Sequence, residues 1–191
     1  MIDEYGFDEF GRPCKDLYAM HISFTVCERS LDQSTKCGCT ITDREGALLC
    51  TGYNGPVMGS IDSNVPRERE DKDRYIVMEH SERNAIYLAA KNGISLRDSI
   101  FFITGIPCLD CLRGIIQVGA EKIVYGPNTA RMINDEYISK YHLILSGSKI
   151  SIERFKYDKG LYKLMPLIEE EMSKKTQIET SRLYKKQEKK E

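Results

Sequence analysis

Two short segments, residues 80–82 (H-S-E) and 107–111 (P-C-L-D-C), constrain the fold of this 191-residue chain more than any other feature. They carry one imidazole, His80, and two thiols, Cys108 and Cys111, all ligands that Zn²⁺ prefers. Binding one ion with all three requires the segments to meet, although about one helix and one strand separate them. Each segment precedes a helical pattern, so we expect two helix starts to face one end of a sheet.

The number of ligands indicates a catalytic metal site. Structural zinc sites are usually closed by four protein ligands, whereas catalytic sites have three and leave a position for water. Pro107 suits the turn into a helix, whose N-terminal amides favour the thiolate forms of Cys108 and Cys111. Glu82 follows His80 by two residues, so on a helix it points elsewhere and is available to the bound water as a general acid and base.

Each segment alone has a simpler interpretation. A Cys-x-x-Cys pair also occurs as a redox pair or as half of a structural zinc site, and a single His on a helix is more often a core or surface residue. The two together are more specific, because H-x-E followed by P-C-x-x-C resembles the signature of zinc-dependent nucleobase deaminases.

Composition and charge limit the class of protein. Hydrophobic residues make up 41% and charged residues 30% of the chain, as in globular proteins. No apolar run approaches the ~20 residues of a membrane helix. Residues 1–11 lack a secretory pattern, so we expect the seven cysteines to be reduced thiols of a cytoplasmic protein, in the host cytoplasm if the gene is viral. A formal net charge of −1 argues against binding driven by a nucleic-acid backbone.

Hydrophobic periodicity predicts alternating helices and strands. The expected helices are residues 14–29, 80–91, 108–118, 129–141 and 161–172, and the expected strands are residues 39–42, 47–51, 99–104, 122–125 and 150–155. The first two strands flank a turn and form a candidate hairpin, and a loop is expected from residue 52 to about residue 75. This alternation implies an α/β sandwich with part of its sheet parallel.

We expect a single domain at residues 1–173, with its core at about residues 14–157. Residues 174–191 are rich in interleaved Lys and Glu, which predicts a frayed helix or a disordered extension rather than a nucleic-acid arm. The charges of residues 67–74 nearly cancel, so this segment is interpreted as a solvated insertion about as readily as a functional one.

Most of the chain from residue 29 to residue 125 resembles the deoxycytidylate (dCMP) deaminases of the cytidine-deaminase-like fold, a family with virus-encoded members. The similar segments are residues 29–39, 51–55, 79–86, 104–111, 114–120 and 124–125. The resemblance implies a three-layer α/β/α sandwich with a mixed sheet of about five strands. It also implies hydrolytic deamination of dCMP to dUMP, a step toward thymidylate. The segment after Gly59 lacks the extra cysteines with which some members bind a second zinc, so we expect one zinc ion per chain.

The resemblance also implies roles for individual residues. His80, Cys108 and Cys111 would bind zinc, and Glu82 would move protons between water, N3 and the leaving amine. Asn54 and Ser81 are expected to contact the substrate, although Ser81 stands where the family usually has Ala. An ordinary Asn-Gly turn is the alternative for Asn54.

Regulation and assembly follow from the same resemblance. In the family, the stretch that corresponds to Gly52, Tyr53, Asn54 and Gly55 is associated with the activator dCTP and the inhibitor dTTP. The family implies a hexamer, but apolar helix faces suit an ordinary core equally well. The substrate phosphate requires one or two cations, and the candidates are Arg29, Lys36, Arg67 and Arg69.

Other functions remain open from the sequence. The same chemistry could act on 5-substituted dCMP, on free cytidine or deoxycytidine, or on adenosine in tRNA, although tRNA calls for an extended basic surface. From a different class, the chain could be a catalytically silent nucleotide sensor or an assembly subunit. Glu82, which a closed structural zinc site does not need, favours an enzyme.

Overall fold

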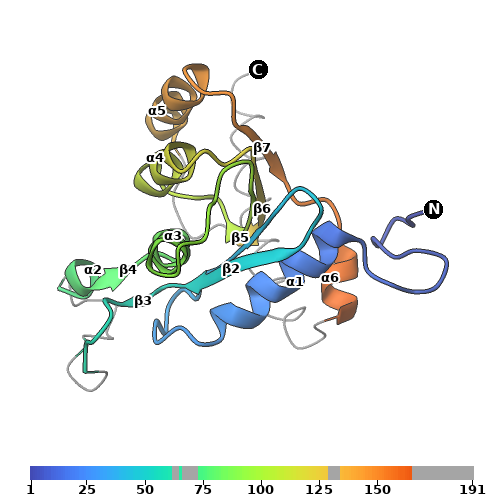
Figure 1. Ribbon diagram of the computed structural model, residues 1–191, viewed down its shortest axis with the longest axis horizontal. Coiled ribbons are helices and arrows are strands. Elements are labelled where there is room, and N and C mark those ends of the chain that lie inside the picture. The colour runs from blue at the N-terminus through green and yellow to red at the C-terminus, as the bar shows by residue number, and fades with distance from the viewer. Residues whose placement is uncertain (62–64, 66–72, 129–133, 165–191) are drawn as a thin grey trace, which may run out of the picture.

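The computed structural model describes residues 1–61, 65, 73–128 and 134–164 (Figure 1). The elements in chain order are α1 (Lys15–Cys27), β1 (Gly38–Thr42), β2 (Leu48–Tyr53), β3 (Gly55–Pro56), α2 (Arg74–Val77), β4 (Met78–Glu79), α3 (Ser81–Lys91), β5 (Ile100–Gly105), α4 (Leu109–Gln117), β6 (Lys122–Asn128), α5 (Asp135–Ser146), β7 (Ser151–Arg154) and α6 (Asp158–Leu164). A five-stranded sheet has the order β2-β1-β5-β6-β7, and β3 pairs with β4 separately.

The sheet is mixed, as predicted. Strand β1 pairs antiparallel with both β2 and β5, whereas β5, β6 and β7 run parallel. Helices α1 and α6 cover one face, and α3, α4 and α5 cover the other (Figure 1). The predicted three-layer α/β/α sandwich with a five-stranded mixed sheet is therefore confirmed.

Alternation along β5 supplies both layers of the core. Phe101 and Ile103 are buried on the face that packs against α3 and α4, where Leu112 also lies. Phe102, between them in sequence, is buried on the opposite face with Phe24 of α1. Because successive side chains of a strand point to opposite faces, one apolar strand holds two helix layers.

The predicted helix at residues 14–29 is confirmed as α1, with four apolar side chains at helical spacing buried against the sheet: Leu17, Met20, Phe24 and Cys27. The predicted hairpin is also confirmed. Asp43 Oδ1 accepts a hydrogen bond from the Ala47 amide at 2.7 Å, and Gly46 has a φ of 85°. Turn chemistry of this kind is local, which is why the sequence predicts it.

The other differences lie at element ends and in the loop expected after residue 52. Strand β2 continues through Gly52 and Tyr53, and the expected loop contains β3 and the start of α2, which β4 follows. Helix α5 begins at Asp135, because the side chain of Asn134 accepts a hydrogen bond from the Tyr137 amide and caps the helix. Helix α6 begins at Asp158, three residues before the predicted start. The predicted helical residues 129–133 and 165–172, and the extension at 174–191, lie outside the described residues.

Helix α3 lies unusually close to β2, and Gly52 makes this possible. A Cβ atom at Gly52 would lie 2.3 Å from the Ser81 carbonyl oxygen and 2.6 Å from the Ala85 backbone nitrogen. The first turn of α3 therefore rests directly on the strand. In the part of the chain that the structure describes, no helix combines the length and apolar character required to cross a membrane.

Candidate metal centre

Two helix starts bring the predicted metal ligands together. His80 is the N-cap residue of α3, and its ring makes no capping hydrogen bond. Cys108 is the N-cap residue of α4, and Cys111 lies in the first turn of that helix. Helix α3 lies in the connection from β2 to β5 and α4 in the connection from β5 to β6, and both pack on the same face of the sheet, so the two N-termini meet.

The spacing of the three side chains fits one zinc ion. His80 Nδ1 lies 3.4 Å from Cys108 Sγ and 3.5 Å from Cys111 Sγ, and all three ligand atoms lie within 4.8 Å of one another. Tetrahedral zinc with ordinary Zn–N and Zn–S bonds places nitrogen and sulfur about 3.5 Å apart. The donor set, one nitrogen and two sulfurs, leaves one tetrahedral position for a non-protein ligand.

The pKa values of the two metal-free thiols are shifted in opposite directions. Hydrogen bonds from Cys111 and His80 lower the pKa of Cys108 to about 3. The Cys111 thiol donates a hydrogen bond to Cys108. This hydrogen bond, together with burial, raises the pKa of Cys111. Binding of a metal ion therefore displaces a proton from Cys111, as expected for a site with two thiolate ligands.

Glu82 is a buried carboxylate beside this cluster and is only 5% exposed. Burial raises its pKa, while hydrogen bonds from its own backbone and from Ser81 oppose that change. The Ser81 hydroxyl donates to Glu82 Oε2 at 3.0 Å. A carboxyl group with a raised pKa can both accept and release a proton near neutral pH.

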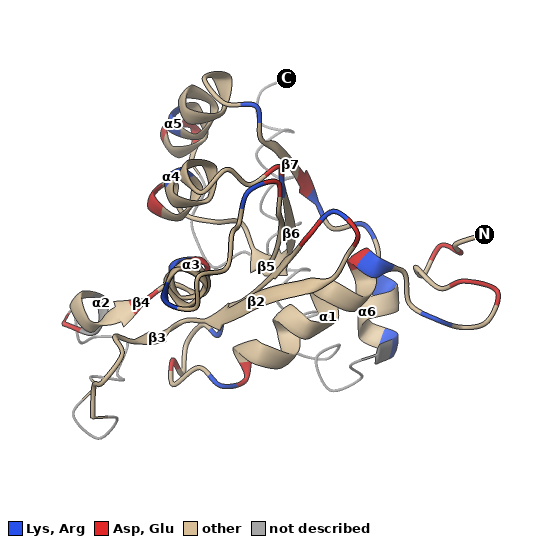
Figure 2. Cartoon of the chain, in the orientation of Figure 1, with Lys and Arg blue, Asp and Glu red and all other residues tan. Residues whose placement is uncertain are grey.

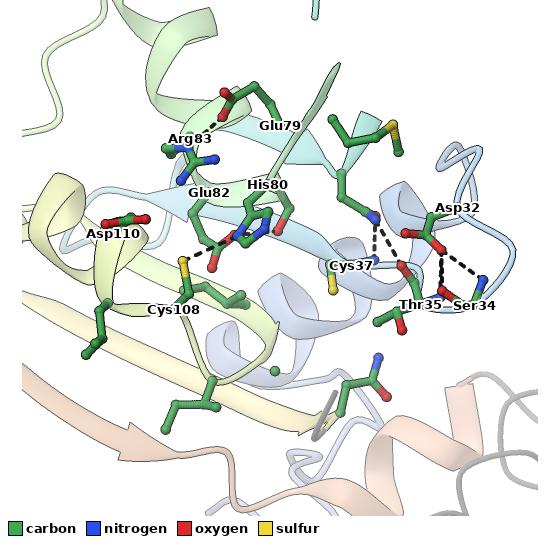
Figure 3. Close-up of a pocket in the computed structure, with 18 of the residues that line it drawn as sticks. Asp32, Ser34, Thr35, Cys37, Glu79, His80, Glu82, Arg83, Cys108 and Asp110 are labelled. Atoms are coloured by element: carbon green, nitrogen blue, oxygen red, sulfur yellow. Dashed lines mark hydrogen bonds and ion pairs between the residues drawn. The ribbon is translucent and has the colours of Figure 1, made fainter. Parts of the chain in front are cut away.

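A pocket of about 750 Å³ connects the cluster with the rest of the candidate site. His80, Glu82 and Cys108 lie together in the pocket, and the segment that carries Asp32 and Thr35 faces them from across it (Figure 3). The volume is in the range of small-molecule sites. The described residues that line it are Asp32, Ser34, Thr35, Cys37, Asn54, Met78, Glu79, His80, Ser81, Glu82, Arg83, Ile103, Gly105, Ile106, Cys108, Leu109, Asp110, Arg113, Asn128 and Tyr137.

Asn54 lines the pocket and also holds its wall in place. Its side-chain oxygen accepts from the Cys37 amide at 2.7 Å, and its side-chain nitrogen donates to the Thr35 carbonyl at 2.9 Å. Asp32 Oδ1 accepts from the Ser34 amide and hydroxyl and from the Thr35 amide. Among the described residues, these partners leave one N–H group and one oxygen lone pair of the Asn54 side chain for a ligand.

The other residues of the predicted effector stretch have different surroundings. Gly52 packs against the first turn of α3, and the Tyr53 carbonyl accepts from the Asn84 side chain at 2.9 Å. The Gly55 position lies against the Tyr53 ring. Of the four residues of the stretch, the pocket lining includes Asn54 alone.

The predicted phosphate cations do not gather at the pocket in the described structure. Lys36 pairs with Glu28 at 2.6 Å, and neither Lys36 nor Arg29 belongs to the described pocket lining. Arg67 and Arg69 lie outside the described residues. Two other arginines line the pocket: Arg83, which pairs with Glu79 at 2.5 Å, and Arg113, which pairs with Asp110.

Sequence reasoning therefore missed several lining groups, among them Arg83, Arg113 and Asn128. Asn128 ends β6 and pairs in register with Gly105 at the end of β5. Ligands of α/β sheets bind beyond the carboxyl ends of parallel strands, so the position of Asn128 after a predicted strand was a usable signal. The two arginines face the pocket through helix packing, which spacing alone does not reveal.

Comparison with known proteins identifies the domain type. Residues 13–127 match the family model described as the cytidine and deoxycytidylate deaminase zinc-binding region. The matched segment includes α1, both metal-bearing helix starts and most of β6.

Individual relatives carry related names. A probable deoxycytidylate deaminase of Drosophila melanogaster is 32% identical over 136 residues, which cover 65% of this chain and 62% of the relative. The deoxycytidylate deaminase of Homo sapiens is 30% identical over 112 residues, covering 56% and 62%. The chain thus spans about three fifths of the length of these relatives.

A solved structure shares the fold. The dCMP deaminase of the cyanophage S-TIM5, in complex with dCMP and dUMP, superimposes with a TM-score of 0.59 at 24% identity. The superposition covers 74% of this chain and 96% of the cyanophage chain.

Proposed function

This chain belongs to the cytidine and deoxycytidylate deaminase family, and on that premise we propose that it hydrolyses dCMP to dUMP and ammonia. The observation that carries the proposal is the convergence of His80, Cys108 and Cys111 beside the buried Glu82, at a pocket that His80, Glu82 and Cys108 line. Relatives about 30% identical that are named deoxycytidylate deaminases support dCMP as the substrate.

We propose that one Zn²⁺ is the cofactor and that His80, Cys108 and Cys111 hold it. The match between the observed N···S distances and tetrahedral zinc geometry supports this assignment. Zinc bound in this way lowers the pKa of a water molecule in its open position and makes that water nucleophilic at neutral pH.

Glu82 is the proposed proton carrier of the reaction. It accepts a proton from the water that attacks C4 of the cytosine ring and donates it to N3. It then takes the second proton of the water and delivers it to the amino group, which leaves C4 as ammonia. The water oxygen stays on C4 as the carbonyl of dUMP, so one water is consumed for each ammonia released.

Asn54 and Ser81 are the proposed substrate-contacting residues. Asn54 lines the pocket with one N–H group and one lone pair unused, which suits a sugar hydroxyl or a base edge. Ser81 also lines the pocket, where its hydroxyl donates to Glu82 Oε2, so it would touch the substrate without donating a hydrogen bond to it.

Ammonia release from a panel of substrates tests the proposal. Zinc-loaded protein is incubated with dCMP, deoxycytidine, 5-methyl-dCMP and an adenosine-containing tRNA. We expect dCMP to have the highest kcat/KM. Equal activity on deoxycytidine would refute recognition of the nucleotide phosphate, and higher activity on tRNA would refute dCMP as the substrate.

The charge distribution of the helices on the pocket side disfavours tRNA as the substrate. In the described structure, α3, α4 and α5 each carry both acidic and basic residues rather than a basic stripe (Figure 2).

We also propose that dCTP activates and dTTP inhibits the enzyme through Gly52, Tyr53, Asn54 and Gly55. The position of this stretch supports the proposal, because it connects the pocket with α3: Asn54 lines the pocket, and Gly52 touches the first turn of α3. Saturation curves for dCMP with and without each triphosphate test this. Unchanged curves would exclude regulation by these nucleotides.

A hexamer is the proposed assembly. Exposed apolar side chains, including those of Met58, Ile76 and Tyr87, support an interface between subunits. Sedimentation at micromolar concentration is expected to give a hexamer, and a monomer would contradict the proposal.

We propose a cytoplasmic protein built as one domain at residues 1–173. All seven cysteines are free, as is usual in a compartment that keeps thiols reduced. The core continues beyond the family match to Leu161 of α6, which supports a single domain. Limited proteolysis is expected to leave a fragment that ends near residue 173, and cell fractionation to place the chain in the cytosol.

A further inference from the structure

The hydrogen bond between Ser81 and Glu82 differs from those of the other buried serines. Ser23, Ser30 and Ser99 each donate to a backbone carbonyl oxygen, of Phe102, Asn54 and Leu96 respectively. Ser81 is 0% exposed like Ser99, but its hydroxyl donates to a carboxylate, Glu82 Oε2, at 3.0 Å. It is the one hydroxyl in the described structure that contacts the proposed proton carrier.

This contact makes the two oxygens of the Glu82 carboxylate different. Oε2 is held by Ser81, whereas no side chain of the described residues donates a hydrogen bond to Oε1. A carboxylate with one anchored oxygen loses most of its freedom to rotate about its terminal bond, which is otherwise a broad torsion. The anchored state therefore presents Oε1 in one orientation.

We propose that Ser81 is a positioning residue that holds Glu82 Oε2 and thereby aims Oε1 at the attacking water. The inference rests on the proposed function, because it assigns the proton transfer of that reaction to one oxygen. The proton of the water passes to Oε1, and Ser81 keeps its own proton throughout. Ser81 acts through Glu82 and takes no part in bond making.

Comparison of Ser81→Ala with Ser99→Ala tests the inference. Both substitutions remove a fully buried, hydrogen-bonded hydroxyl, but Ser99 does not line the pocket. We expect Ser81→Ala to lower kcat about 10-fold to 100-fold. KM for dCMP and zinc content should stay nearly unchanged, because the hydroxyl proton is held by Glu82 and not by the substrate. Ser99→Ala is expected to keep the kcat of the wild type.

A third variant tests whether kcat depends on the strength of the hydrogen-bond donor at position 81. Ser81→Cys replaces the hydroxyl with a weak donor, so its kcat should fall between those of the wild type and Ser81→Ala. If Ser81→Ala does not fold, Ser81→Cys tests the inference instead, and a lowered kcat at unchanged KM would support it. A kcat for either variant equal to that of the wild type would overturn the inference.

A second readout does not use activity. Ser81→Ala is expected to lower the urea midpoint of unfolding less in a Glu82→Ala background than in the wild type, because the partner of the hydroxyl is then already missing. Equal effects in both backgrounds would show that the hydroxyl acts elsewhere. A wild type inactive on every substrate would refute the proposed function, whereas an active wild type with an equally active Ser81→Ala would refute this inference alone.

Discussion

Burial of the Glu82 side chain costs stability when its carboxyl group is ionised. Its carboxylate is 5% exposed, and burial raises its pKa above the ordinary value of 4.5. The folded protein therefore binds this proton more tightly than the unfolded chain does. The stability that the protonated group contributes is complete below about pH 4.5 and is lost as the pH rises through the pKa of the folded state.

We therefore predict that Glu82→Gln stabilises the zinc-free protein at neutral pH. The amide fills the same space without a charge, so the gain should grow from near zero at pH 4.5 by at most about 1.4 kcal/mol per pH unit until the folded-state pKa is passed. Urea unfolding of both proteins at pH 4.5 and 7.5 measures the difference.

A suitable control is Glu136→Gln. The Lys140 side chain lowers the pKa of the exposed Glu136, so this substitution should not stabilise the protein at pH 7.5. A gain for Glu82→Gln that is the same at both pH values would contradict the proposed origin in ionisation.

At the scale of elements, the metal ligands depend on how closely α3 lies on β2. Gly52 leaves room for this approach, since a Cβ there would meet two backbone atoms of the first turn of α3. Gly114, within α4, differs because its Cβ would meet only Ile86 Cδ1, at an ordinary 3.6 Å. The two glycines thus form a matched pair for testing helix placement.

Gly52→Ala is predicted to destabilise the fold by about 1–3 kcal/mol and to weaken zinc binding, because the displaced helix start carries His80. Gly114→Ala should instead stabilise the protein by about 0.5–1 kcal/mol, as expected for alanine in a helix interior. Urea unfolding and zinc titration of both variants provide the measurements. Wild-type zinc affinity in Gly52→Ala would show that the close approach does not position His80.

For the whole molecule, the proposed zinc joins the starts of two helices on one face of the sheet. Zinc that binds only the folded state stabilises it by about 4 kcal/mol when free zinc is 1,000 times its Kd. We predict that a chelator lowers Tm and that amide exchange rises first in α3 and α4. Helix α1 packs on the opposite face, so its exchange should change least. Uniform loss of protection over both layers would contradict this view.

Much of the architecture follows from local sequence. The spacing of Leu17, Met20 and Phe24 predicts α1, and turn residues predict the hairpin of β1 and β2. The segments at residues 80–82 and 107–111 predict the metal ligands, because ligand chemistry belongs to residue types. Helix ends were predicted less well, since the cap of α5 depends on one side-chain hydrogen bond of Asn134.

Long-range packing decided how the pocket is built and where α3 lies on the sheet. The sequence alone determined an alternating α/β chain with three candidate metal ligands and a spare carboxylate, because periodicity and donor chemistry act over a few residues. Only the tertiary structure decided that Asn54 holds the wall of the pocket, that Arg83 and Arg113 line it, and that Gly52 seats α3 on β2. These contacts join residues far apart in the chain, and they form only when the two layers close on one sheet.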